Sequence, residues 1–228
     1  MTPEQLAALL PANSVFADGS SEQLADLLRA GKLQTLAPNE VVLRQGDDGD
    51  SLVILLEGVM RVSMVTPNGR EIILDYAEPG AVVGEIAVLD GEPRTASAIS
   101  MWQGRLLRLS RRSFEELMER HPKIAIRLLR ELAHRLRQTN ATIESDRAFT
   151  TGPRLARYLK RLSDSKVNGA KLTSDLSQSE LGMFVGISRE NINRQLSAWA
   201  NDGVIELSQG KIRVIDPDYL SQIAEAVY

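Results

Sequence analysis

The spacing of apolar positions changes along this chain, and each spacing predicts a different kind of element. Residues 21–30 (SEQLADLLRA) carry apolar side chains at helical intervals between a serine cap and Gly31, which predicts a helix. From Leu33 to Leu109 the apolar runs are shorter and turn residues recur between them. The predicted strands there include Val41–Leu43, Leu52–Leu56, Val59–Val65, Ile72–Tyr76 and Arg105–Leu109. Many short strands joined by regular turns favour an antiparallel β-barrel or jelly roll.

A long helix is predicted after the strands. Residues 113–119 have a helical pattern, and Pro122 begins a second helix whose seam positions alternate in steps of four and three. The seam consists of Ala125, Leu129, Leu132, Leu136, Thr139 and Ile143. This heptad pattern favours pairing of residues 122–149 with a second copy of the helix, over packing on the chain's own barrel. Thr139 interrupts the apolar seam beside Asn140, and polar residues at such positions set register or contact a ligand.

A domain boundary is predicted at Thr150-Thr151-Gly152-Pro153, which offers a cap, a flexible residue and a proline suited to a first helical turn. The pattern beyond it predicts helices at 154–162, 176–185 and 188–201, followed by strands at 204–207 and 212–215. Helices closed by a hairpin describe a winged helix-turn-helix. The predicted α+β chain therefore has three parts, residues 1–121, 122–149 and 150–228.

Composition and charge limit the function classes. The chain of 228 residues is 43% hydrophobic and 25% charged, as expected of an ordinary soluble protein, and no window is apolar enough to span a membrane. It has no cysteine, which excludes disulfides, thiolate metal sites, iron–sulfur clusters and cysteine nucleophiles. Two isolated histidines, His121 and His134, make a poor metal or haem site. The cytoplasm is the expected location. The net charge of −3 does not by itself indicate nucleic acid.

The segment Gly84–Ala98, GEIAVLDGEPRTASA, is the first candidate site. It places Glu85 and Arg94 at the two ends of a short, otherwise largely apolar stretch. A buried arginine is costly unless it meets an anion. A glutamate beside Gly84, where the backbone can approach a ligand closely, supplies an acceptor for a hydroxyl. A phosphate and a sugar hydroxyl would satisfy both groups, so the segment predicts a nucleotide pocket.

The same segment resembles the phosphate-binding cassette of cyclic-nucleotide-binding domains. Residues 176–196, LSQSELGMFVGISRENINRQL, resemble the helix-turn-helix of the cyclic-AMP receptor protein (CRP/FNR) family of bacterial transcription regulators. The similarity covers nearly the whole chain in the family's order of barrel, long helix, hinge and winged helix. It implies a homodimer that binds double-stranded DNA and RNA polymerase, and that does not act as an enzyme.

The resemblance implies a role for each pocket residue. Glu85 accepts from the ribose 2′-hydroxyl beside Gly84, while Arg94 and Thr95 bind the cyclic phosphate. Thr139 and Asn140 match the long-helix positions that reach the base, partly from the opposite subunit. Cyclic AMP is favoured as the allosteric ligand. Cyclic GMP is possible, because Thr95 can serve the guanine amino group and Asn140 offers both a donor and an acceptor. The implied ligand set contains no metal, haem or iron–sulfur cluster.

The resemblance also implies a DNA reader in the second motif. Arg189, Glu190 and Arg194 match the family's base-reading triplet, which predicts a TGTGA-like palindrome as target. Further contacts, chiefly to phosphates, are expected from Ser177, Gln178, Ser179, Ser188 and Asn191. Without the resemblance, these charges would be interpreted as a solvated helix face.

Other interpretations remain open from the sequence alone. A family member without ligand would leave Glu85 and Arg94 as a mutual ion pair in an empty barrel. An enzyme that uses the nucleotide as a substrate would need a general base, and the resemblance commits Glu85 to the ribose. The arginine-rich run Arg105–Arg112 is interpreted as an exposed strand end and helix start, and Trp102 and Trp199 as packing residues.

Overall fold

The computed structural model describes residues 1–12, 14–148, 151–164, 166–167, 170–171, 181, 189–208 and 211–225. The chain forms two compact units, Met1–Arg135 and Leu136–Tyr228. Because this division falls inside the long helix, the predicted boundaries at 121 and 149 remain a proposal.

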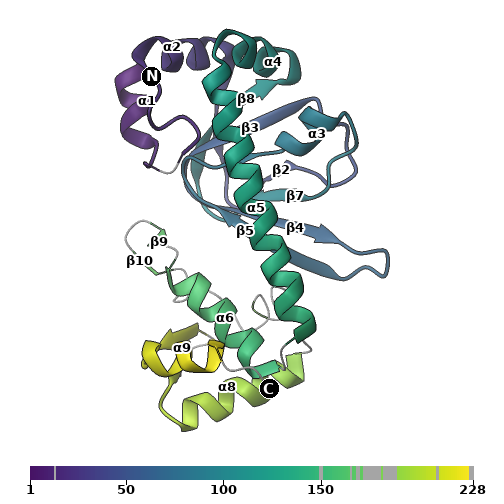
Figure 1. The fold of residues 1–228 in the computed structure, drawn as a ribbon, viewed down its shortest axis with the longest axis vertical. Coiled ribbons are helices and arrows are strands. Elements are labelled where there is room, and N and C mark those ends of the chain that lie inside the picture. The colour runs from purple at the N-terminus through teal and green to yellow at the C-terminus, as the bar shows by residue number, and fades with distance from the viewer. Residues whose placement is uncertain are drawn as a thin grey trace. The chain divides into compact units, whose positions relative to one another are not determined.

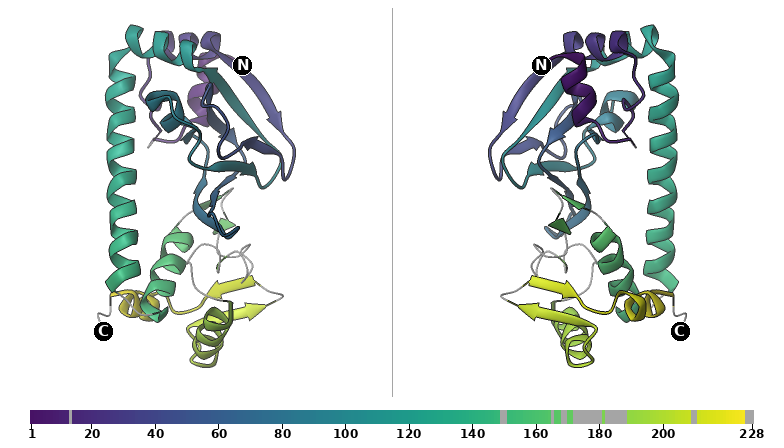
Figure 2. Two further views of the ribbon diagram at one scale, coloured as in Figure 1. Left: turned by 90° about the vertical axis from the view of Figure 1, so that its right-hand side faces the viewer. Right: turned by 90° about the vertical axis from the view of Figure 1, so that its left-hand side faces the viewer.

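Two four-stranded antiparallel sheets form a β-roll in the first unit (Figures 1 and 2). One sheet has the order β1 (Gly31–Leu36), β8 (Gly104–Ser110), β3 (Ser51–Glu57) and β6 (Val82–Val83). The other has the order β2 (Val41–Leu43), β7 (Ser97–Ser100), β4 (Met60–Val65) and β5 (Glu71–Ala77). The predicted fold class is confirmed, although β1, β6 and β7 were not among the strands named from the pattern.

Strand β3 separates the two apolar layers of this unit. Leu52, Ile54 and Leu56 belong to the core beneath the helices. Val53 and Leu55 point to the opposite face and belong to the core between the sheets. Because both faces of the strand are covered, its sequence is a continuous apolar run rather than an alternating one.

Four helices cover the first sheet, namely α1 (Pro3–Leu9), α2 (Ser21–Ala30), α4 (Arg111–Arg120) and the N-terminal part of α5 (Pro122–Ala148). Capping boxes start the first two: Thr2 and Gln5 for α1, and Ser20 and Gln23 for α2. Their buried leucines pack with Phe114 of α4 against β3 and β8.

Helix α5 has two different apolar faces. Ile124 and Leu128 are buried in the core of the β-roll, and Leu132 packs against the same core. Leu129 and Leu136 are 64% and 61% exposed in the single chain. The predicted seam is therefore divided, because Leu132 covers the chain's own core while Leu129, Leu136 and Ile143 remain exposed.

The junction between α4 and α5 is fixed by a buried carboxylate. The Asp26 side chain on α2 is 3% exposed. His121 Nε2 lies 2.9 Å from Asp26 Oδ2, Arg120 donates to the same oxygen at 3.1 Å, and Arg29 pairs with the other oxygen. These hydrogen bonds, that of His121 foremost, hold the pKa of Asp26 far below its usual range. His121 thus has a structural partner, and the described residues contain no group of side chains suited to a metal.

The second unit contains α6 (Thr151–Asp164), α8 (Arg189–Asn201), the hairpin β11 (Ile205–Ser208) and β12 (Lys211–Val214), and α9 (Pro217–Glu225). A short pair, β9 (Lys166–Val167) and β10 (Ala170–Lys171), follows α6. The buried residues of the second unit include Leu155 and Leu159 of α6, Trp199 of α8 and Leu220 of α9. The packing role predicted for Trp199 is confirmed, whereas Trp102 is 36% exposed. No helix within the described ranges is long and apolar enough to cross a membrane.

We predict that Asp26→Asn destabilises the first unit, because Arg29, Arg120 and His121 lose the carboxylate that they surround. Chemical denaturation at neutral pH measures the lower free energy of unfolding. A depressed folded-state pKa stabilises the fold above the unfolded value of about 4, and this contribution is lost as the pH falls. The difference in free energy of unfolding between wild type and variant should therefore become smaller below about pH 4. The control is Asp18→Asn, whose side chain is 86% exposed; an equal effect of the two variants would contradict the assignment.

Candidate functional site

The candidate cassette begins with a short helix between two glycines. Helix α3 (Glu85–Asp90) is preceded by Gly84 at φ +88° and followed by Gly91 at φ +81°. Both values lie in the left-handed region that favours glycine. A Cβ at position 84 would lie 2.7 Å from Arg94 Nη1 and 2.8 Å from Leu43 Cδ1. Gly84 therefore both permits the turn and leaves room for the guanidinium.

Arg94 is held firmly on both its backbone and its side chain. Its backbone N–H donates to Asp47 O, and its carbonyl accepts from Gly46 N, each at 2.9 Å. Its Nη2 donates to Ser51 O at 2.8 Å and lies 3.3 Å from both Ser51 Oγ and Asp50 Oδ1.

The other terminal nitrogen of Arg94 is different. Although the residue is only 6% exposed, Nη1 is buried without a hydrogen-bond partner among the described residues. A buried cationic donor of this kind is costly to desolvate. The arrangement can therefore accept an anion beside Gly84, and a phosphate oxygen is an acceptor that a guanidinium N–H binds well.

Glu85 occupies the other side of the cassette and is 3% exposed. Its Oε1 accepts from Arg135 Nη1 of α5 at 2.7 Å. Burial raises the pKa of Glu85, and the Arg135 charge partly opposes that rise. Within the described part of the chain, Glu85 pairs with Arg135 and Arg94 pairs with Asp50. The mutual Glu85–Arg94 ion pair is thus not what the structure shows.

Arg135 is a site residue that the sequence pattern did not reveal. Besides Glu85, it donates from Nη2 to Val82 O at 2.9 Å and from Nε to Glu131 at 3.2 Å. One signal in the sequence could have found it. Arg135 precedes Thr139 by four residues, which places both on the same face of α5.

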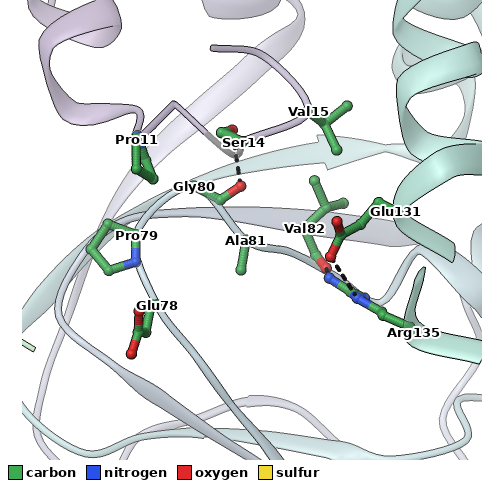
Figure 3. A pocket seen from close by; sticks show the side chains of 10 residues that line it. All are labelled: Pro11, Ser14, Val15, Glu78, Pro79, Gly80, Ala81, Val82, Glu131 and Arg135. Carbon is green, nitrogen blue, oxygen red and sulfur yellow. Dashed lines mark hydrogen bonds and ion pairs between the residues drawn. The ribbon is translucent and has the colours of Figure 1, made fainter. Parts of the chain in front are cut away.

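A cavity of about 150 Å³ lies on the other side of this arginine (Figure 3). Its walls come from Pro11, Ser14 and Val15, from the loop 78–81 between β5 and β6 with Val82 of β6, and from Glu131 and Arg135 of α5. Figure 3 shows the Arg135 guanidinium turned toward Glu131 and the Val82 carbonyl. Glu78 lies at another edge of the cavity, and burial raises the pKa of its carboxyl. The cavity is separate from the space around Arg94, because neither Arg94 nor Gly84 lines it.

The other predicted pocket residues are Thr95 in the cassette and Thr139 and Asn140 on α5. Thr95 follows Arg94 directly and is exposed. Thr139 and Asn140 are exposed on α5, but they belong to the second compact unit. The structure thus brings Gly84, Glu85 and Arg94 together with Thr95 adjacent, and the approach of the two α5 residues stays a prediction.

The predicted DNA reader is only partly described. Arg189 is the first residue of α8, and Glu190 and Arg194 are exposed on it. Arg194 Nη2 donates to Asn191 Oδ1 at 3.0 Å. The opposite side of α8 is buried in the core of the second unit, through Ile192, Leu196 and Trp199. Ser177, Gln178, Ser179 and Ser188 lie outside the described residues.

Comparison with known proteins identifies both regions. Residues 33–121 match the cyclic nucleotide-binding domain, and residues 153–223 match the Crp-like helix-turn-helix domain. A CRP-like cAMP-activated global transcriptional regulator of Mycobacterium tuberculosis is 34% identical over 80% of this chain and 84% of its own length. The cyclic AMP receptor protein of Thermus thermophilus is 31% identical over 80% of this chain and 83% of its own.

A solved structure agrees with these matches. A CRP/FNR-family transcriptional regulator of Thermus thermophilus is 27% identical, with a TM-score of 0.70 over 86% of this chain and all of the other. The fold and site thus define a regulator that joins a cyclic nucleotide-binding domain to a DNA-binding domain. The chain belongs to the CRP family, and the resemblance noted in the sequence is confirmed. Both the Mycobacterium tuberculosis relative and this solved structure are transcriptional regulators.

We predict that Gly84→Ala destabilises the protein more than Gly69→Ala does. Both glycines have positive φ, but a Cβ at Gly69 would meet nothing within 4 Å. The control should cost about 1–2 kcal/mol for the left-handed backbone. Gly84→Ala should add about 1–3 kcal/mol for crowding against Arg94 and Leu43. Urea denaturation measures the free energy of unfolding of both variants. An equal loss of stability in Gly84→Ala and Gly69→Ala would contradict the close approach at Gly84.

Proposed function

We propose that this chain is a homodimeric transcription regulator activated by cyclic AMP and specific for TGTGA-like palindromes. The observation that carries the proposal is the buried Nη1 of Arg94 beside Gly84, which has no hydrogen-bond partner among the described residues and lies in the same short segment as the buried carboxylate of Glu85. Family membership supplies the class of ligand, and these residues supply the chemistry for it. Calorimetry with cyclic AMP and with cyclic GMP tests the proposal, and no heat with either would contradict it.

The phosphate end of the proposed site is built on Arg94. Since Nη2 is used by Ser51 and Asp50, the guanidinium is held in place while Nη1 is left for a phosphate oxygen. A planar guanidinium bound on one edge presents its other edge with little further loss of side-chain entropy. The hydroxyl of Thr95, the next residue, is the proposed second donor.

The ribose end is built on the Glu85–Arg135 pair. Burial alone would favour a neutral carboxyl at Glu85, and the nearby Arg135 charge favours the carboxylate that can accept from a 2′-hydroxyl. We propose that Arg135 keeps Glu85 ionised and fixes its orientation. Because Arg135 lies on α5, this contact also links the ribose end of the site to the long helix.

The choice of nucleotide rests on the relatives and on two residues. The Mycobacterium tuberculosis and Thermus thermophilus relatives, at 34% and 31% identity, are a cAMP-activated regulator and a cyclic AMP receptor protein. This supports cyclic AMP. Thr95 and Asn140 both carry groups that can hydrogen-bond guanine, so a response to cyclic GMP is the second candidate.

The proposed dimer uses the outer face of α5. Leu129, Leu136 and Ile143 are exposed in the single chain, while Ile124 and Leu128 on the other face are already buried. Pairing two such helices along these residues would remove apolar surface from water, which favours association. Thr139 lies between Leu136 and Ile143 on the same seam, so the pairing would bring the proposed base contacts to the interface.

The proposed DNA contacts come from the start of α8. Arginine can bind guanine O6 and N7, and glutamate can accept from cytosine N4, which supports Arg189, Glu190 and Arg194 as readers of the half-site. A twofold dimer would place two such helices in successive major grooves. Cyclic AMP need only bind the DNA-competent arrangement more tightly than the other to activate it. RNA polymerase is the proposed downstream partner.

We predict that Arg94→Leu abolishes cyclic AMP binding and nucleotide-dependent DNA binding without unfolding the protein. Loss of the guanidinium should cost about 2–5 kcal/mol in nucleotide affinity. Calorimetry and fluorescence anisotropy measure the two effects, with circular dichroism to confirm the fold. The control is Arg112→Leu, whose side chain is 89% exposed and ion-paired with Glu116. Retained activation in Arg94→Leu would refute the phosphate site.

We predict that Arg189→Ala leaves cyclic AMP affinity unchanged and relaxes base preference. Loss of a bidentate guanine contact should cost about 1–3 kcal/mol on a matched TGTGA palindrome, and little on one with the contacted guanine replaced. Anisotropy titrations with both duplexes at one fixed salt concentration measure the difference. If the variant weakened binding to both duplexes equally, Arg189 would be a phosphate contact rather than a base reader.

A further inference from the structure

Arg108 of β8 is a second arginine near the site. The run Arg105–Arg112 was predicted to be exposed, and for Arg108 this is wrong because its side chain is half-buried. On β8 it shares a face with Leu106, which belongs to the core between the sheets. Arg108 therefore points into the β-roll, as Leu106 does.

Arg108 and Arg94 converge on one hydroxyl group. Arg108 Nη1 and Arg94 Nη2 each lie 3.3 Å from Ser51 Oγ. The same hydroxyl donates to Asp50 Oδ1 at 2.9 Å. The remaining nitrogens of Arg108 are fixed by protein acceptors, Nε by Gln34 Oε1 at 3.0 Å and Nη2 by Val42 O at 3.1 Å.

Two guanidinium groups held this close repel each other. Burial lowers the pKa of Arg108, and the positive charge of Arg94 lowers it further. The carboxylates of Asp50 and Glu40 oppose this shift only in part. Asp50 is also 83% exposed, so water screens its charge. The carboxylates that oppose the charges of Arg94 and Arg108, those of Asp50 and Glu40, are both exposed, so the two guanidinium groups are only partly compensated.

An anion beside Arg94 would relieve this repulsion. Nη1 of Arg94, without a partner in the part of the chain that the structure describes, marks the place where such an anion can be bound directly. All three nitrogens of Arg108 already donate a hydrogen bond within the protein, so among the described residues the unsatisfied buried donor at this end of the roll belongs to Arg94. The charge of Arg108 would still attract the anion, and its hydrogen bond to Ser51 supports the group that fixes Arg94.

We propose that Arg108 is a positioning residue of the phosphate site, which strengthens binding of a cyclic mononucleotide by its positive charge and by supporting the Ser51–Arg94 contact. This inference rests on the proposed function and extends it to a residue outside the cassette. The charge is the main contribution, because the ligand-facing nitrogen belongs to Arg94.

The test compares two substitutions at position 108 by calorimetry of the full chain with cyclic AMP. Arg108→Met removes the charge and the hydrogen bonds, whereas Arg108→Lys keeps the charge but loses the planar fork. We expect Arg108→Met to weaken cyclic AMP binding about tenfold, and Arg108→Lys to lose about threefold or less. A purely structural role would weaken both variants equally, and that result would overturn the proposal.

Two matched controls separate charge from packing. Gln34→Ala removes the acceptor of Arg108 Nε and leaves the charge in place, so its affinity should stay close to that of wild type. Arg105→Met removes a charge on the same strand, where Arg105 pairs with Glu57, and should also leave affinity unchanged. Wild-type affinity in Arg108→Met, or a tenfold loss in Gln34→Ala, overturns the role of the charge while nucleotide binding itself stands. Absence of binding in wild type overturns the proposed function as well.

Discussion

The structure of this site depends on one constraint, the need to compensate a guanidinium that is buried in an apolar roll. Arg94 is only 6% exposed, and the described residues around it provide acceptors for one terminal nitrogen but not for the other. The glycine at position 84, the turn at 46–47 and Ser51 on β3 all hold the group in this half-satisfied state. Such a state persists because the surrounding β-roll is stable enough to maintain it, and it provides a place for an anion.

A second buried charge, the carboxylate of Glu85, links the site to the long helix. On the other side of the cassette, Glu85 is buried and pairs with Arg135 of α5. One face of α5 covers the core of the β-roll, and the other leaves Leu129 and Leu136 exposed. The helix that we propose as the dimer interface therefore also carries the partner of Glu85, the carboxylate that we propose binds the ribose. A ligand that binds between cassette and helix can then favour one arrangement of the dimer through contacts that differ between states.

Local signals predicted the parts of the fold that follow simple periodicity. Helix α2, the start of α5 at Pro122 and strand β3 all appear close to their predicted ranges, because burial on a defined face imposes a regular pattern. The two-residue strand β6 and the six-residue helix α3 are too short for a periodic pattern and depend on tertiary contacts. Among site residues, the glycine and charge pattern indicated Gly84, Glu85 and Arg94. Arg108 was missed because its arginine-rich run was interpreted as exposed, and Arg135 because its helical spacing to Thr139 does not by itself show that a buried glutamate lies against it.

The most direct test is an anisotropy titration of a TGTGA palindrome with the full-length protein, in the absence of nucleotide and with saturating cyclic AMP or cyclic GMP. We expect weak, salt-sensitive binding without nucleotide and at least about tenfold tighter binding with cyclic AMP, specific to the matched palindrome. Affinity for the palindrome that is the same with and without either nucleotide would contradict the claim that the pocket around Arg94 controls the DNA reader.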